Sequence, residues 1–193
     1  MSKILTKSDL KRYLEIESQL YSRSRISEFL FPSCIGQLLS ALRHFEYYTN
    51  RTGVLSSIMK IFYHIRYRKL RLLTGLTIPP NTCAEGLTIY HTGSVVINSA
   101  TKIGRNCCIM NNVNIGANGG SHKAPKIGDN VYIGPGAVIF GDIEIADGCY
   151  VGANAVVNKS FLEPNSVIVG IPAKVVKKDN VCWWEKNHLK RHK

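Results

Sequence analysis

Apolar residues recur at intervals of three and four through the first third of the chain. The pattern is clearest in DLKRYLEIESQL (9–20), IGQLLSALRHFEYY (35–48) and VLSSIMKIFYHIRYRKLRLL (54–73). This spacing puts one apolar stripe on each segment and predicts three amphipathic helices. Ser8 is the expected cap of the first helix, and Pro32 and Gly53 are the expected breaks. We expect a helical N-terminal domain over residues 1–74.

A six-residue period replaces the helical pattern from Ile97 onward. The chain reads INSATK, IGRNCC, IMNNVN, IGANGG, then IGDNVY, IGPGAV, IFGDIE, IADGCY, VGANAV and VNKSFL. EPNSVI breaks the series, which we expect to resume at Val169. The second place of each six is often Gly, which we attribute to a corner with positive φ. The insertion SHKAPK (121–126) has six residues and should preserve the register.

This period predicts a left-handed parallel β-helix over residues 75–176. Three such hexapeptides make one triangular coil, and the Ile or Val of each points into the prism. A β-sandwich would alternate every two residues instead, with turns at less regular intervals. The helices should cap one end of the prism. VGIPAKVVKK should close the other end, ahead of a basic tail over residues 177–193.

Charge is distributed unevenly along the 193 residues, whose formal net charge is +12. Residues 1–74 carry 13 Lys and Arg against 5 Asp and Glu, and residues 173–193 carry 7 against 2, while the middle is close to neutral. Basic ends suit nucleic acid, an anionic membrane or an acidic substrate. No helix-turn-helix, zinc-finger or RNA-binding pattern is present, so we expect no nucleic-acid partner. A solvated basic surface is the plainer alternative.

The cysteines and the N-terminus indicate a cellular compartment. The six cysteines include no CxxC pair, and MSKILTKSDLKRYLEIESQL has no apolar stretch typical of a signal peptide. No apolar run is long enough for a transmembrane helix. We therefore expect reduced thiols and a cytoplasmic protein, whose basic ends would also suit peripheral association with the inner membrane face.

One histidine stands out in the apolar stretch GLTIYHTGSVVIN (86–98). His91 lies in it beside a Gly and a Ser, just before the regular period begins. Histidine titrates near neutral pH and can take and return a proton, so His91 is a candidate general base. A structural histidine is the alternative on these residues alone.

The chain from about Leu76 to Lys178 resembles the hexapeptide-repeat acyltransferases, specifically the serine acetyltransferase-like group. The motifs that carry the resemblance are GLTIYHTGSVVIN, IGANGG, PKIGDNVYIGPGAVIFGDI, VGANAVV and GIPAKVV. The resemblance implies acetyl-CoA as co-substrate, His91 as general base and a backbone oxyanion hole that includes Gly119. It places coenzyme A beside Pro135, Ala153, Asn158, Lys159 and Lys174. We expect the acceptor substrate near Tyr90, Asn112, His122 and Lys123.

Three positions depart from the pattern of serine acetyltransferases. Tyr90 stands where that group has an Asp for its substrate, and Leu76 where it has the Asp that partners the histidine. Lys123-Ala124 replaces an Arg-His pair that binds the serine carboxylate. We therefore predict acetylation of a hydroxyl on a surface-polysaccharide sugar or its precursor. The alternatives are a serine O-acetyltransferase of cysteine biosynthesis and a non-catalytic scaffold.

The resemblance also indicates partners. Prisms of this kind pack side by side, so we expect a homotrimer with active sites between subunits, which accepts a glycan or sugar. A catalytic zinc site usually has three protein ligands. Because the prism has only His91 and His122, we expect no metal.

Overall fold

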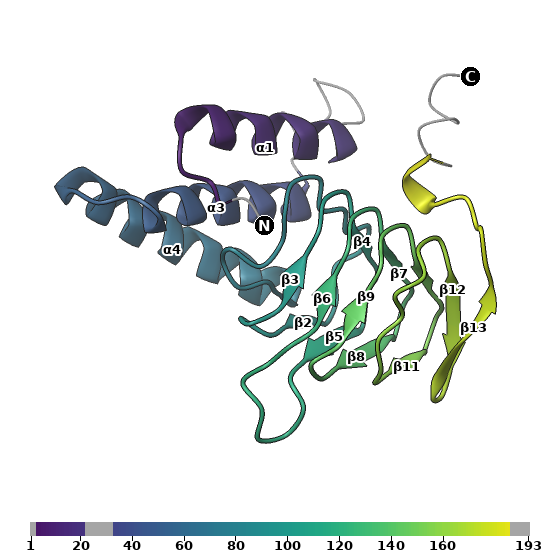
Figure 1. Cartoon of the computed structure of the whole chain (residues 1–193). Helices are drawn as coiled ribbons and strands as arrows, with labels where there is room; N and C mark the ends of the chain where they lie inside the picture. The colour runs from purple at the N-terminus through teal and green to yellow at the C-terminus, as the bar shows by residue number, and fades with distance from the viewer. Residues whose placement is uncertain (1–2, 22–32, 186–193) are drawn as a thin grey trace.

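The computed structural model describes residues 3–21 and 33–185 (Figure 1). Its helices are α1 (Lys7–Tyr21), α3 (Cys34–Thr49) and α4 (Val54–Thr74). The helices predicted over 9–20, 35–48 and 54–73 lie inside them. Gly53 directly precedes α4, as predicted, and Pro32 lies outside the described residues. No helix in the described part of the chain is long and apolar enough to cross a bilayer.

The cap of α1 differs from the prediction of Ser8. The Thr6 hydroxyl accepts a hydrogen bond from the backbone N–H of Asp9 at 3.0 Å, and the Asp9 carboxylate accepts from the backbone N–H of Thr6 at 2.9 Å. This reciprocal pair is a capping box. Ser8 lies inside the helix because the two partners are Thr6 and Asp9, three residues apart.

Short strands follow the helices. They are β1 (Leu76–Thr77), β2 (Val95–Ile97), β3 (Lys102–Ile103), β4 (Cys108–Ile109), β5 (Val113–Gly116), β6 (Lys126–Ile127), β7 (Tyr132–Ile133), β8 (Val138–Phe140), β9 (Glu144–Ile145), β10 (Tyr150–Val151), β11 (Val156–Val157), β12 (Val167–Gly170) and β13 (Ala173–Lys177).

These strands form three sheets, which make the sides of a triangular prism (Figure 1). Sheet A has the order β1-β2-β5-β8-β11, sheet B the order β3-β6-β9, and sheet C the order β13-β12-β10-β7-β4. Every pairing is parallel except that of β12 with β13. The chain visits A, B and C in turn and then begins the next coil, which is the arrangement of a parallel β-helix.

The interior is filled by the first residue of each six, which is usually Ile or Val, together with the small residue in the fifth place, such as Val131, Ala137 or Ala155. On sheet C, Ile109 pairs with Ile133, Ile133 with Val151, and Val151 with Ile168, and all four are fully buried. Ile168 corrects the predicted resumption at Val169. Ile133 and Val151, which pair on sheet C, are 18 positions apart, whereas Val151 and Ile168 are 17 positions apart. The last coil is therefore one residue shorter than the one before it, so Ile168 faces the core and Val169 is only partly buried.

Glycines in the second place of each six have a different role from the one predicted. In most sixes the residue with positive φ stands in the fourth place, as Asn106, Asn112 and Gly136 do, and Gly170 is the second-place glycine that has positive φ as predicted. Other second-place glycines avoid a clash between coils instead. A Cβ at Gly134 would lie 2.7 Å from the backbone nitrogen of Ala153 in the next coil. The fourth place makes the turn, and the second allows the coils to stack closely.

The inserted residues leave the register intact, as predicted. They belong to a longer connection between β5 and β6 that extends away from the prism (Figure 1). The residues on either side keep their partners, since Ile115 pairs with Ile139 and Ile127 with Ile145.

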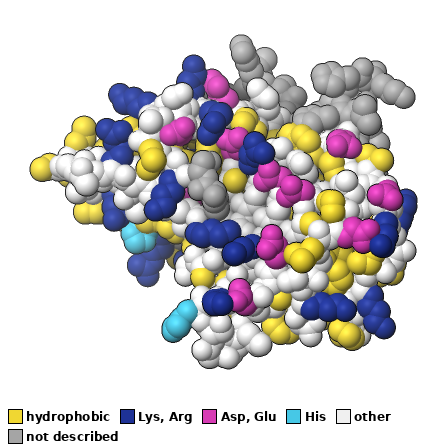
Figure 2. Space-filling model, in the orientation of Figure 1, with side chains coloured by type: hydrophobic (Ala, Val, Ile, Leu, Met, Phe, Trp, Pro, Cys, Tyr) yellow, Lys and Arg dark blue, Asp and Glu magenta, His cyan; other side chains and the backbone are white. Residues whose placement is uncertain are grey.

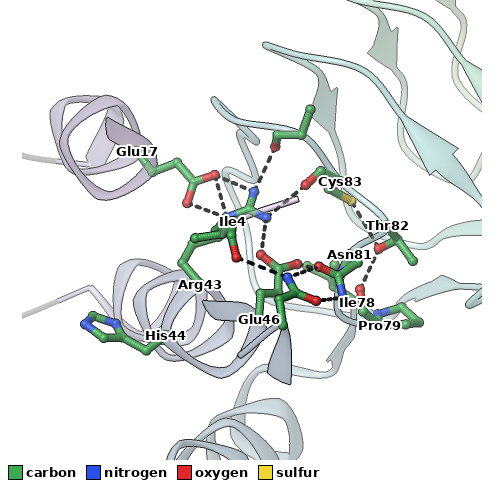
Figure 3. Close-up of polar contacts among 12 residues, drawn as sticks. Ile4, Glu17, Arg43, His44, Glu46, Ile78, Pro79, Asn81, Thr82 and Cys83 are labelled. Atoms are coloured by element: carbon green, nitrogen blue, oxygen red, sulfur yellow. Dashed lines mark hydrogen bonds and ion pairs between the residues drawn. The ribbon is translucent and has the colours of Figure 1, made fainter. Parts of the chain in front are cut away.

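A buried polar cluster joins the helices to the first coil (Figure 3). The guanidinium of Arg43 on α3 is fully buried and donates to the carboxylates of Glu17 and Glu46 at 2.6 and 2.9 Å. It also donates to the backbone carbonyls of Cys83 and Ala84 at 2.9 and 2.8 Å. Burial raises the pKa of Glu17, against the opposing effect of Arg43. One side chain thus ties α1, α3 and the first coil together.

The opposite end of the prism is covered by the C-terminal segment. β13 turns back antiparallel to β12, and the chain then passes the corner at Asn165, whose carbonyl accepts from the N–H of Asn180. Cys182 and Trp183 are buried there. Residues 186–193 of the predicted basic tail lie outside the described residues.

Candidate functional site

Two edges of the prism carry almost all the predicted site residues. We call the edge where the chain turns from sheet C to sheet A the C/A edge, and the edge where it turns from sheet A to sheet B the A/B edge. Both border sheet A, one on each side.

His91 lies on the C/A edge at the first coil, in an exposed bend between the bridge at Thr88 and β2. The bend is longer than its equivalents. Eight positions separate the inward residues Ile89 and Ile97, against six for Ile109 and Ile115. The two extra residues push the His91 backbone outward, so this side chain is presented to solvent rather than packed in the core.

The end of α4 holds this bend in place. The N–H of Gly93 donates to the carbonyl of Thr74 at 2.9 Å, and the N–H of Val95 donates to that of Gly75. Gly75 has φ of +75°, and a Cβ there would lie 2.9 Å from the carbonyl oxygen of Gly93. Only glycine permits both this left-handed cap and the close approach. The helical part of the chain therefore positions the candidate base.

Further predicted residues continue down the C/A edge. Asn112, Pro135 and Ala153 occupy the same edge in the following coils, and Asn112 and Ala153 are exposed. Lys174 is exposed at the start of β13, just after the last turn of this edge. Small side chains thus form a shallow strip that begins at His91 and ends near a lysine.

Tyr90 stands beside His91 and is 48% exposed. It lies near Tyr132 on the outer face of sheet C, where the Tyr132 and Tyr150 rings stack with centroids 4.3 Å apart. Burial raises the pKa of Tyr132, and its neighbours Tyr150 and Tyr90 add to the rise. Tyr132 is therefore a neutral hydrogen-bonding group at physiological pH.

The other predicted residues lie on the A/B edge. Gly119, His122 and Lys123 are exposed in the long connection between β5 and β6, and Asn158 and Lys159 are exposed in the last coil. The Lys123 ammonium lies 2.7 Å from a carboxylate oxygen of Asp142. The N–H of Gly119 already donates to the Asn118 side chain at 3.1 Å, so an oxyanion would have to displace that bond.

The structure therefore divides the predicted site into two halves. The half with His91 and the half with Gly119 and Lys123 lie on different edges of sheet A, and the width of the sheet separates them within one chain. Glu85 lies on the third edge, away from His91, and its carboxylate is 2.9 Å from the Arg12 guanidinium. Asn111 is closer, because its Cβ lies 3.5 Å from where a Cβ on Gly93 would stand.

A separate cavity of about 700 Å³ opens between the helices and sheet B. Its lining includes Arg12, Lys102 and Asp129 but none of the predicted site residues. Within the described residues, no three His, Cys, Asp or Glu side chains come together as metal ligands would.

Comparison with known proteins identifies the family. Residues 124–159 match the model of the bacterial transferase hexapeptide (six repeats). The serine acetyltransferase of Staphylococcus xylosus is 34% identical over 149 residues, which are 69% of this chain and 68% of that protein. The chain belongs to the serine acetyltransferase family. This membership confirms the predicted hexapeptide-repeat acyltransferase.

Other members of the family agree. The serine acetyltransferase of Staphylococcus aureus (strain Mu50) is 40% identical over 114 residues, which are 58% of this chain and 53% of that protein. The structure of the soybean serine acetyltransferase apoenzyme aligns with a TM-score of 0.67 and 27% identity, over 88% of this chain and 68% of that one. The chain spans about half the length of the first curated relatives that it matches.

These relatives overturn one prediction. We expected a hydroxyl of a surface-polysaccharide sugar as acceptor, from the departures at Tyr90, Leu76 and Lys123. The family members that match are named serine acetyltransferases, so the polysaccharide prediction and its glycan partner are wrong. The three substitutions alter details of a site without moving the chain out of the family.

Sequence reasoning missed the residues that support the site. Gly75 and Gly93 fix the bend of His91, and Asp142 holds Lys123. The Gly75 signal was available, since a glycine after a basic helical segment indicates a C-cap. The contact between Lys123 and Asp142 joins two coils, and only folding brings them together.

Proposed function

We propose that this chain transfers the acetyl group of acetyl-CoA to the side-chain hydroxyl of serine, the reaction of a serine O-acetyltransferase. The likeness to the Staphylococcus xylosus serine acetyltransferase over two thirds of both chains carries this proposal. His91 adds chemical support, because it is exposed at the edge of the prism, where two substrates can reach it.

In the proposed mechanism His91 is general base and then general acid. Its imidazole accepts the proton of the serine hydroxyl while the oxygen attacks the thioester carbonyl carbon. The tetrahedral oxyanion then collapses and the carbon–sulfur bond breaks. The imidazolium returns the proton to the departing thiolate, which gives O-acetylserine and free coenzyme A. Backbone N–H groups around Gly119 would stabilise the oxyanion.

We infer that the complete site forms between two copies of the chain. The C/A edge of one subunit would face the A/B edge of the next, which brings His91 toward Gly119 and Lys123. Coenzyme A would lie in the groove between them, past Pro135 and Ala153 on one side and Asn158 and Lys159 on the other, with Lys174 available for a phosphate. Left-handed winding of the coils and a homotrimer complete this proposal.

The outer face of sheet A supports a homotrimer through that sheet. Register places Val96 beside Asn114, Asn114 beside Val138, and Val138 beside Val156, so three of these four outward residues are apolar. The outer face of sheet B has Lys102, Lys126 and Glu144 instead. Apolar outward faces are the ones that subunits bury.

Replacing Val138 by lysine should dissociate the trimer, because it puts an unpaired charge at the centre of the buried face. Light scattering should give a trimer for the wild type and a monomer without transferase activity for Val138→Lys. Leu162→Lys is the control, because it adds the same charge at an apolar residue that is 69% exposed and lies outside sheet A. A wild-type monomer, or a trimeric Val138→Lys variant, would contradict the interface.

Serine recognition needs a cation for the carboxylate and an anion for the ammonium group. We propose that Lys123 and Asp142 supply them, since they form an exposed pair beside the Gly119 segment. A bound serine would exchange this contact for one with each of its own charges. This pair would take the place of the family's Arg-His motif.

Release of free thiol from acetyl-CoA tests the proposed function. We expect release with L-serine and none without an acceptor, and a Lys123→Met variant should have a higher KM for serine at a similar kcat. Lys126→Met is the control, because Lys126 is exposed on sheet B. Acetyl-CoA binding without any serine-dependent release would contradict serine as the acceptor.

A further inference from the structure

Helix α4 exposes a continuous apolar face. Six side chains make up this α4 face, and each is at least 53% exposed: Val54, Leu55, Ile58, Ile61, Phe62 and Ile65. Their spacing of three and four puts them on one side of the helix. The opposite side is the packed one, since it carries the buried Tyr67, Leu70 and Thr74. A surface helix normally turns its apolar side toward the core and its polar side toward solvent. An apolar side that faces solvent therefore requires an explanation.

Positive charge surrounds the α4 face. The helix carries Lys60, Arg66, Arg68, Lys69 and Arg71 and no acidic residue. At 100° per residue, Arg66 and Arg68 fall on the two flanks of the apolar face. Lys69 lies one turn beyond Ile65 on the same side, and its long stem lets the ammonium reach past apolar neighbours. Figure 2 shows hydrophobic and basic side chains together where the helices project from the prism.

We propose that α4 binds in the plane of an anionic lipid surface. An apolar face with cations on both flanks fits such a surface, because the apolar side chains enter the acyl region while the cations meet the phosphates. A second copy fits less well, because two α4 apolar faces packed together would bring Arg66, Arg68 and Lys69 of both copies to one contact with no carboxylate on either helix. The charge therefore favours lipid as the occupant. This proposal is independent of the acceptor of the acetyl group.

Sedimentation of the full chain with vesicles tests the proposal. Vesicles of phosphatidylglycerol and phosphatidylcholine in equal parts should bind the protein, and vesicles of phosphatidylcholine alone should bind it weakly. The double variant Ile61→Ser/Phe62→Ser should lose most of this binding, while Leu162→Ser should retain it. Arg66→Gln/Arg68→Gln should weaken binding by about fivefold for each cation removed. Lys7→Gln/Lys177→Gln removes the same charge from exposed positions elsewhere and should change it less.

Three results would overturn the proposal. The first is no binding to the anionic vesicles. The second is equal binding by the wild type and Ile61→Ser/Phe62→Ser, which would assign the lipid contact to other basic segments. The third is a lower molar mass for Ile61→Ser/Phe62→Ser than for the wild type in solution, which would make the α4 face a contact between copies. Circular dichroism should show the same helix content in every variant, because the substituted side chains are exposed.

Discussion

His91→Ala should lower kcat for acetyl transfer from acetyl-CoA by roughly 10²–10⁴-fold, the usual contribution of a positioned acid–base group. The loss follows from the mechanism, since no other described histidine lies on the C/A edge and the serine hydroxyl would have to lose its proton to water. KM for acetyl-CoA should change little, because the cofactor strip lies further down the edge. Thiol release under saturating substrates measures the effect.

Two further variants separate chemistry from structure. Thr92→Ala removes an exposed side chain from the same bend and should leave kcat nearly unchanged. His91→Gln keeps a polar side chain of similar size and should be as slow as His91→Ala. The role of His91 as base is wrong if His91→Ala retains the wild-type kcat. Normal unfolding curves for all three variants would show that any loss is chemical, as expected for an exposed residue.

Arg43→Met should destabilise the protein by about 3–5 kcal/mol, the cost of removing one partner from a buried ion pair. The substitution leaves the carboxylates of Glu17 and Glu46 buried at 4% and 2% exposure with no cation between them. It also leaves the carbonyls of Cys83 and Ala84 without the donor that Arg43 supplies. The free energy of unfolding in urea, followed by circular dichroism, measures the loss.

A compensating variant tests whether unpaired charge is the cause. Arg43→Met/Glu17→Gln/Glu46→Gln removes both carboxylate charges and should recover part of the lost stability. Arg105→Met breaks an exposed pair with Asp129 and should have a small effect. If Arg43→Met unfolds at the wild-type urea concentration, the cluster does not hold the helices on the first coil. Because that coil presents His91, activity should fall with stability.

Periodicity predicted most of the architecture because each period has one geometric solution. The helical stripes over 9–20, 35–48 and 54–73 match α1, α3 and α4, and the hexapeptides from Ile97 match the parallel strands of the three sheets. Local chemistry was less easily predicted. The cap at Thr6 depends on a hydrogen bond with Asp9, three residues away. The position of the positive φ within each six and the inward side chain of Ile168 depend on how successive coils align.

The acceptor shows how far individual residues can mislead. Tyr90, Leu76 and Lys123 differ from the family pattern, and we gave these three positions more weight than the likeness over the rest of the chain. The wider comparison corrected this prediction. A substitution at a site changes one contact, whereas the identity of many residues reflects the whole framework that holds the substrates.

The sequence by itself determined the prism and the helices before it, because periodicity is a local property, and its resemblance to the serine acetyltransferases singled out His91 as the candidate base. Only the tertiary structure decided which residues share an edge. It placed His91 and Gly119 on different edges of sheet A, gave Lys123 its partner Asp142, and anchored the bend of His91 on Thr74 and Gly75. It also left one side of α4 apolar and exposed. The physical reason is that contacts between coils and helices join residues far apart in the chain, and no period in the sequence specifies such pairs.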